Sequence, residues 1–367
     1  MKFHCEKDAL FEALNIAGRA PSRSGMTPGV RLSLDGSRLQ ISGKDSDLLI
    51  EVSLPVMGTE DGTVILPSAL TTNLIKSLPE GSVEFSSDDA SAEVVGGRSK
   101  FIIQTLLDIE PPFIKSPVGD MVTVNEESFK EGLRQVIRAA AKDDARDVMY
   151  TGVLFSAVED GLRMVATDGM RLAIRDIAGM NVLSADGEVI VPARALSELE
   201  RILSYQQNPS DHLSVEIGSK DAMFKIGEIS LTTRLIEEKY RDYRQIMQAS
   251  YPRRLIVDKK SFLESVRRLR IMAKENREIT HLRMDIEEGS VKLSVRSPQV
   301  GQATEDLDGI FTGEPFTIAF DPDLLLDGAE GVVSDSVSME FTEMNKAACI
   351  SNVDNNSYTY LLMPIRF

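Results

Sequence analysis

The chain is poor in the residues that most catalytic and metal centres use. Its 367 residues include two cysteines and three histidines. Cys5 and Cys349 lie far apart and without a metal-ligand spacing, which indicates a reducing compartment and predicts no disulfide. His4, His212 and His281 are scattered, so we expect no metal site. Neither a G-x-S-x-G elbow nor a GK[ST] phosphate loop is present, and we therefore expect no catalytic residue and no cofactor.

Long apolar runs are also missing. No segment approaches the roughly 18 apolar residues of a membrane span, and the first ten residues are charged where a signal peptide needs an apolar run. These absences predict a cytoplasmic protein with no membrane partner. Positive charge is in deficit, because 41 Lys and Arg face 57 Asp and Glu. The net negative charge alone predicts repulsion from nucleic acid. Whether the chain can bind nucleic acid therefore depends on where its positive residues lie.

What is present in place of these features is a threefold internal repeat. A helical pattern with apolar residues four apart follows a short strand in each copy: KDALFEAL from Lys7, EESFKEGL from Glu126 and KKSFLESV from Lys259. Strand pairs then begin at residues 39, 162 and 291. A strand that runs into a second helix follows in each copy, anchored at Ile65, Ile190 and Ile318. The pattern predicts an α+β fold with three tandem copies of one domain.

Proline-rich connectors separate the copies and give predicted domains of 1–120, 121–252 and 253–367. Each copy should have two helices and about eight short strands. Sheets of that size leave exposed edges, and exposed edges pair with a neighbouring copy or with another chain.

One hairpin stands out in the middle copy. Between residues 162 and 176, apolar residues alternate with arginines on both sides of Thr167-Asp168-Gly169, and Asp-Gly favours a tight turn. We predict two strands with apolar residues on one face and arginines on the other.

Basic residues concentrate on equivalent helices. The middle copy has Lys130, Arg134, Arg138 and Lys142 at four-residue spacing, and residues 259–274 of the third copy hold six bases against Glu264. For any single helix, a solvated face is the simpler interpretation. The recurrence across copies instead favours contact with nucleic-acid phosphates without base recognition.

Three short motifs complete the pattern: ATDG-x-RLA at Ala166–Ala173, MP-x-R at Met363–Arg366 and DYR at Asp242–Arg244. With the repeat, they make the whole chain resemble the bacterial DNA polymerase III beta subunit family. The resemblance implies a sliding clamp: a head-to-tail homodimeric ring with helices inside and sheets outside, which encircles duplex DNA as a processivity factor. It also implies the DNA polymerase III alpha subunit, the clamp loader and other clamp-binding-motif proteins as partners.

The resemblance also implies sites. Dimer contacts would be Phe101 and Ile103 facing Ile271 and Met272 of a second chain. Arg23 and Arg194 match DNA-contact positions and join Lys130, Arg134 and Arg138 as candidate DNA contacts. A partner peptide would bind between the second and third copies, in a pocket made of Tyr150, Thr167, Gly169, Met170, Arg171, Leu172, Ile246, Leu362, Met363, Pro364, Ile365 and Arg366.

Several residues depart from the family pattern, namely Tyr150, Met170, Arg241 and Asn345. They motivate an alternative, a specialised clamp paralogue with altered partner preference. A hypothesis from a different class is a metal-dependent phosphodiesterase that uses paired acids. The candidate pairs are Asp45/Asp47, Asp143/Asp144 and Asp321/Asp323, although pairs of this kind are usually turn and cap residues.

Overall fold

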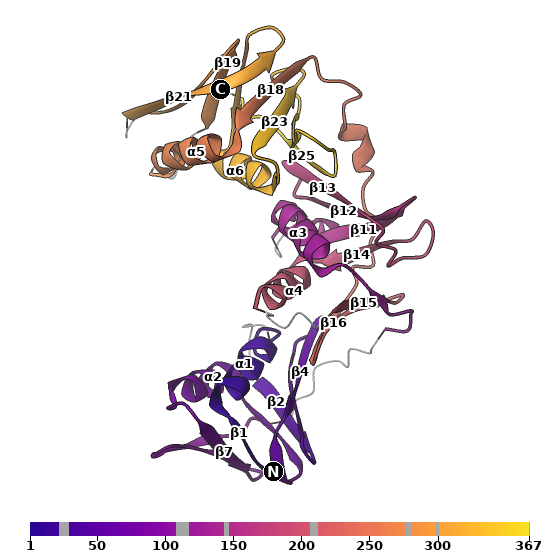
Figure 1. The fold of residues 1–367 in the computed structure, drawn as a ribbon, viewed down its shortest axis with the longest axis vertical. Coiled ribbons are helices and arrows are strands. Elements are labelled where there is room, and N and C mark those ends of the chain that lie inside the picture. The colour runs from indigo at the N-terminus through magenta and orange to yellow at the C-terminus, as the bar shows by residue number, and fades with distance from the viewer. Residues whose placement is uncertain are drawn as a thin grey trace. The chain divides into compact units, whose positions relative to one another are not determined.

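The computed structural model describes residues 1–21, 29–107, 117–142, 147–205, 212–275, 281–298 and 301–366. The chain forms two compact units (Figure 1). The first contains Met1–Glu126 and Ala195–Leu235, and the second contains Glu127–Arg194 and Ile236–Phe367. The middle copy therefore contributes to both units.

The first unit consists of two antiparallel sheets and their covering helices. The five-stranded sheet has the order β5-β1-β7-β8-β9, and the eight-stranded sheet has the order β10-β15-β16-β17-β4-β3-β2-β6. The elements are β1 (Lys2–Glu6), α1 (Lys7–Ala17), β2 (Gly29–Asp35), β3 (Arg38–Lys44), β4 (Leu48–Pro55), β5 (Met57–Glu60), β6 (Gly62–Pro67), α2 (Ser68–Ser77), β7 (Ser82–Ser87), β8 (Ser91–Gly96), β9 (Ser99–Gln104), β10 (Val122–Thr123), α4 (Ala193–Tyr205), β15 (Leu213–Ile217), β16 (Asp221–Ile226) and β17 (Ile229–Arg234).

The eight-stranded sheet joins the first copy to half of the middle copy. β17 pairs with β4 in a register that sets Leu231 opposite Ile50. Helix α1 packs closely on this sheet at Gly43, where an added Cβ would lie 1.9 Å from the carbonyl oxygen of Ala17. Only glycine allows that approach, so the sequence fixes how close the helix can come to β3.

The second unit is built on one twelve-stranded antiparallel sheet, in the order β14-β11-β12-β13-β25-β24-β23-β18-β21-β20-β19-β22. The elements are α3 (Glu126–Val136), the 3₁₀ turns η1 (Ile137–Ala139), η2 (Val148–Thr151) and η3 (Tyr243–Ile246), β11 (Gly152–Val158), β12 (Gly161–Thr167), β13 (Arg171–Ala178), β14 (Glu188–Pro192), β18 (Arg253–Asp258), α5 (Lys259–Lys274), β19 (Leu282–Glu287), β20 (Ser290–Ser297), β21 (Gly301–Thr312), β22 (Phe316–Phe320), α6 (Pro322–Gly331), β23 (Ser336–Phe341), β24 (Ala348–Asn352) and β25 (Tyr358–Leu362).

The third copy is joined to the middle copy through β13 and β25. Their register sets Leu172 opposite Leu361 and Ala173 opposite Tyr360. Helices α5 and α6 lie side by side against the strands of the third copy (Figure 1). Both helices begin at an aspartate: Asp258 accepts a hydrogen bond from the Ser261 amide, and Asp321 accepts from the amides of Asp323 and Leu324.

The sequence-based predictions of three repeated copies and of their helix faces are confirmed. The residues predicted to face inwards from the first helix of each copy are fully buried, namely Leu10, Leu14, Phe129, Leu133, Phe262 and Val266. One helix boundary was wrong. Helix α3 ends at Val136, so Arg138 lies in η1 and Lys142 lies beyond it, off the predicted stripe. The domain limits at 120 and 252 stay a prediction. None of the helices in the described ranges has the length and hydropathy of a membrane span.

Candidate functional site

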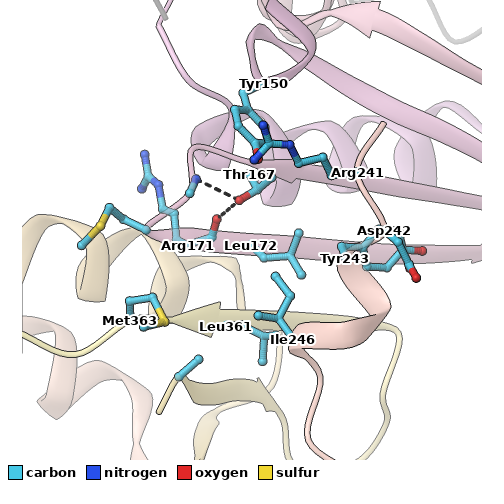
Figure 2. Close-up of a pocket in the computed structure, with 13 residues that line it drawn as sticks. Tyr150, Thr167, Arg171, Leu172, Arg241, Asp242, Tyr243, Ile246, Leu361 and Met363 are labelled. Carbon is cyan, nitrogen blue, oxygen red and sulfur yellow. Dashed lines mark hydrogen bonds between the residues drawn. The ribbon is translucent and has the colours of Figure 1, made fainter. Parts of the chain in front are cut away.

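The turn of the β12–β13 hairpin satisfies its own polar groups. Thr167 Oγ1 donates to the carbonyl oxygen of Arg171 and accepts from the Gly169 amide at 3.1 Å (Figure 2). Asp168 Oδ1 accepts from the amides of Met170, at 2.9 Å, and Arg171, at 3.1 Å. Gly169 has a φ of 91°, a conformation that favours glycine. The Thr-Asp-Gly stretch therefore forms a turn whose backbone is fixed by its own side chains.

The prediction that the hairpin has one apolar and one arginine face is wrong. Thr167 pairs with Leu172, so four residues separate the paired positions and Ile174 lies opposite Val165. Because paired residues share a face, arginines and apolar residues occur on both faces. Arg163 is paired with Asp176 through two 2.7 Å hydrogen bonds, and Arg175 lies 2.8 Å from Glu131. Both arginines are thus used within the fold.

A cavity of about 230 Å³ opens beside this hairpin (Figure 2). It lies above a buried apolar cluster that includes Leu154, Val165 and Ile190. The cavity is lined by residues from η2, from the β12–β13 hairpin, from the segment around η3 and from the third copy. Its lining consists of Tyr150, Thr167, Gly169, Met170, Arg171, Leu172, Arg241, Asp242, Tyr243, Ile246, Ala347, Leu361 and Met363.

The structure brings eight of the predicted pocket residues together here: Tyr150, Thr167, Gly169, Met170, Arg171, Leu172, Ile246 and Met363. It leaves Leu362, Pro364, Ile365 and Arg366 out of the lining. Leu362 is fully buried in the ladder between Arg171 and Ala348. Ile365 donates its amide to the carbonyl oxygen of Ala319 at 2.8 Å. The side-chain alternation along β25 could have shown that Leu361, not Leu362, faces the same side as Met363.

Sequence reasoning missed five lining residues: Arg241, Asp242, Tyr243, Ala347 and Leu361. Two of them, Asp242 and Tyr243, belong to the DYR motif, which had been noted for its resemblance but not assigned to the pocket. No local pattern points to Ala347, because its hairpin reaches the cavity only through tertiary packing.

Arg171 connects the pocket wall to helix α6. Its side chain is only 11% exposed, and it pairs with Asp168 at 3.0 Å and with Asp327 of α6. The Tyr360 hydroxyl lies 3.4 Å from the same guanidinium. Burial alone would lower the pKa of Arg171, but these neighbours raise it above its ordinary value. Arg171 is therefore a positively charged group whose charge is already paired with Asp168 and Asp327.

The rim of the cavity carries a stacked pair. The Arg241 guanidinium lies 5.6 Å from the centre of the Tyr150 ring and 3.0 Å from Asp147 Oδ2 (Figure 2). Arg241 is 67% exposed, whereas the cavity floor below it is apolar. The mouth and the floor thus offer a charge and an apolar surface at neighbouring positions.

The predicted DNA contacts differ in their surroundings. Arg138 pairs with Glu330 and Asp327 of α6, so its charge is partly used within the protein. Lys130 and Arg134 lie on α3, and Arg194 lies in the first turn of α4. Arg23 lies outside the described residues.

Helix α5 and helix α6 form what we call the paired helix face. Arg267 lies 2.8 Å from Glu330, and Arg270 and Lys274 both contact Asp323. Nearby, Arg268 lies 2.6 Å from Glu305 of β21, and the hydrogen bonds from Arg268 and Ser265 outweigh burial and lower the pKa of Glu305 to about 2. Four of the six basic residues of α5 are therefore matched by acids that sequence spacing could not reveal, because those acids lie 37 to 63 residues away from their arginine partners.

The predicted dimer residues are not equally exposed. Ile271 is 69% exposed and Met272 and Phe101 are half-buried, but Ile103 is 2% exposed within its own sheet. Its neighbour Ile102 is 62% exposed. On β9 the outward apolar side chain is therefore Ile102, because side chains alternate along a strand.

The paired acids proposed for metal binding have local roles where the structure describes them. Asp45 accepts from the amides of Asp47 and Leu48, and Asp321 caps α6. Asp143 and Asp144 lie outside the described residues. Within the described part of the chain, no group of three or more metal-ligating side chains is assembled.

Three tandem α+β copies joined edge to edge through their sheets define a clamp-type fold. Family models for the N-terminal, central and C-terminal domains of the DNA polymerase III beta subunit match residues 1–114, 123–242 and 244–366. The chain belongs to the DNA polymerase III beta subunit family.

Named relatives agree along the whole chain. A beta sliding clamp of Streptomyces coelicolor is 30% identical over 100% of this chain and 99% of its own length. One from Staphylococcus aureus is 26% identical over the same shares. A solved clamp of Bartonella birtlesii bound to griselimycin is 26% identical with a TM-score of 0.92, and each chain is covered in full. A Bacillus subtilis clamp has a TM-score of 0.90 at 23% identity, covering 100% of this chain and 99% of its own. The function is that of a DNA sliding clamp, a processivity factor.

Proposed function

We propose that two copies of this chain close head to tail into a ring around duplex DNA and tether a replicative polymerase through the pocket at β13 and β25. Binding to DNA would be independent of sequence and would involve no catalysis. Other partners would be the clamp loader and further proteins with a clamp-binding motif. The observation that carries the proposal is the strand pairing between copies: β4 of the first copy pairs with β17 of the second, and β13 of the second pairs with β25 of the third.

The two strand pairings that join the copies within one chain, β4 with β17 and β13 with β25, suggest how two chains would join. We call this proposed pairing between two chains the third joint. Within the described residues, β9 ends its sheet, and residues 301–308 of β21 pair on one side only, with β20. Two such edges on one chain suit a head-to-tail partner, and a closed dimer would leave neither edge open. Ile102 and Ile271 would then be apolar contacts of this third joint.

A sizing and retention experiment tests the ring. The protein should be a dimer by light scattering at micromolar concentration. After loading by its clamp loader, it should stay on nicked circular DNA and leave when the circle is linearised. Ile102→Asp should yield monomers, because it places a charge at the proposed joint, whereas Met57→Asp on the opposite edge strand β5, 68% exposed, should not. A monomeric wild type, or equal retention on linear DNA, would refute the ring.

A second experiment tests the pocket. Ile246→Asp changes a lining side chain that is 46% exposed, so the fold should tolerate it. It should weaken binding of a polymerase-derived peptide by at least about tenfold, because a buried charge would face the apolar floor. Val333→Asp, at a position 50% exposed and outside the lining, is the control. Equal affinity for wild type and Ile246→Asp would reject the site.

The same titration separates a main clamp from a specialised paralogue. The rim formed by Tyr150 and Arg241 supports the paralogue alternative, because it places a charged, stacked pair at the mouth. Micromolar or tighter affinity for the polymerase-derived peptide would favour the main clamp. Binding weaker than millimolar, with tight binding of another motif peptide, would favour the paralogue.

A further inference from the structure

The charged residues that line the cavity differ in how many of their polar groups are already bonded within the protein. Arg171 is surrounded by Asp168, Asp327 and Tyr360 and is only 11% exposed. Asp242 accepts from the amide of Arg244 at 3.1 Å and from Gln245 at 3.2 Å, and it lies 3.7 Å from the Arg244 guanidinium. Arg171 is therefore buried among its partners, whereas Asp242 is 51% exposed but already has hydrogen-bond and charge partners in Arg244 and Gln245.

Arg241 is different. Among the residues that the structure describes, it forms one ion pair, in which Nη2 donates to Asp147 Oδ2 at 3.0 Å. A guanidinium has five N–H donors in one plane, so after one such contact other N–H groups can donate to a second carboxylate. The guanidinium lies over the Tyr150 ring, 5.6 Å from its centre, and this cation–π contact holds Arg241 at the mouth. The side chain is 67% exposed, and Asp147 is 40% exposed, so a ligand can reach both.

The cavity floor below Arg241 is apolar and offers no partner for a charged group of a ligand. Leu172, Ile246 and Leu361 line the cavity, with Met170 and Met363 beside them. Flexible methionines suit several apolar side chains, so the floor selects for hydrophobicity more than for shape. Discrimination between partner peptides must then come from the rim.

We propose that Arg241, held against Tyr150, is a specificity-determining residue that pairs with an acidic side chain of the partner peptide while an aliphatic or aromatic side chain of that peptide fills the cavity. The inference rests on the proposed pocket and adds a chemical requirement to it. An acidic peptide is favoured over a basic one because Asp242 is occupied within η3 and Asp147 is already bridged by Arg241.

A random heptapeptide phage library can test this with the full-length protein. Selections would use wild type, Arg241→Gln and Arg241→Glu. Arg244→Gln is the matched control, because Arg244 is 57% exposed and stacks on Tyr243 but does not line the cavity. Wild type and Arg244→Gln should enrich apolar residues together with Asp or Glu at one fixed offset. Arg241→Gln should keep the apolar residues and lose the acid, and Arg241→Glu should enrich Lys or Arg at that offset.

Affinities then make the result quantitative. A selected peptide and its acid-to-amide counterpart, Asp to Asn or Glu to Gln, would be titrated by fluorescence anisotropy. The change should weaken binding about tenfold for wild type and less than about threefold for Arg241→Gln, since a hydrogen-bonded charge pair at a partly dry rim is lost only in the first case. Equal losses in both proteins would overturn the role of Arg241.

Failure of the inference can be told apart from failure of the pocket. If selected peptides carry apolar residues without an acid and Ile246→Asp abolishes them, the pocket stands and the role of Arg241 falls. If no peptide is selected, or if Ile246→Asp leaves the selected peptides bound, the pocket itself is wrong.

Discussion

The pocket and the paired helix face lie in the same unit, yet they use their charged residues in opposite ways. In the pocket, Arg171 is buried among its partners, Asp242 is bonded to its neighbours in η3, and the exposed Arg241 lies above an apolar floor. On the paired helix face, Arg267, Arg270 and Lys274 stay near solvent, and each has a carboxylate beside it. The pocket therefore presents the exposed Arg241 and an apolar floor to a ligand. On the paired helix face, these basic groups already have carboxylate partners within the protein.

The comparison shows why counting charges along one helix overstates its attraction for phosphate. Helix α6 carries Asp323, Asp327 and Glu330 and no Lys or Arg. Its carboxylates pair with Arg267 and Lys274 of α5 and with Arg138. Contact with DNA at this face must displace an internal partner, so it should be weaker than the number of bases suggests.

The largest expected effect concerns the packing that holds α6 in place. An added Cβ at Gly328 would lie 2.4 Å from Cδ1 of Tyr360. Tyr360 cannot move freely, because its hydroxyl donates to the carbonyl oxygen of Leu324 at 2.8 Å. Gly328→Ala should therefore destabilise the protein by about 2 kcal/mol, even after the gain in helix propensity. Urea unfolding would measure this, with Glu264→Ala at an exposed position of α5 as the control. An unchanged midpoint would show that α6 has room to shift.

Releasing the bases of the paired helix face should have an intermediate effect. The double substitution Asp323→Asn and Glu330→Gln removes the partners of Arg267, Arg270 and Lys274 and one partner of Arg138. Affinity for a linear duplex at low salt should rise by about tenfold, and it should fall more steeply as salt is added. Anisotropy titrations at two salt concentrations would measure both, with Asp242→Asn in the pocket as the control. If the double variant binds no better than the control, the carboxylates do not mask the face.

The smallest effect is a pH dependence on the same face. Glu305 has a pKa of about 2 in the folded protein, below its ordinary value of 4.5, mainly because Arg268 donates to it. A depressed carboxyl pKa stabilises the fold above pH 4.5, and that contribution is lost as the pH falls towards 2. Relative to Glu305→Gln, wild type should be more stable by about 1 kcal/mol at pH 7, and the difference should shrink by pH 3. Urea midpoints at both pH values would measure it, and a constant difference would contradict the assignment.

The parts of the site that lie in one continuous stretch could be predicted from the sequence. Thr167–Leu172 form one wall because the turn is fixed by its own residues, and the helix faces follow from apolar spacing. Of the residues brought in by tertiary packing, Tyr150, Ile246 and Met363 were implied by the family resemblance, and the other five were not assigned to the pocket. Arg241 reaches the rim through the segment before η3, and no periodic pattern marks such a segment.

Two errors had a geometric origin. The hairpin faces were misassigned because sequence alternation does not show how many residues the turn contains, and one added residue exchanges the faces. Ile103 was taken for a surface residue because a strand's position at an interface does not tell which of two neighbouring side chains points outwards. Charge pairs between α5 and α6 could not be anticipated at all, since their members are distant in sequence.

The β13–β25 ladder also has a consequence for biosynthesis. β13 is translated long before β25, so the edge of Arg171–Ala178 that β25 later covers remains open while the third copy is being made. An open edge can pair with the wrong strand, and closing so long a loop is slow. The pocket wall is therefore complete only when the third copy has folded onto it. A nascent or truncated chain would be exposed to aggregation at this edge and would be unable to recruit a partner prematurely.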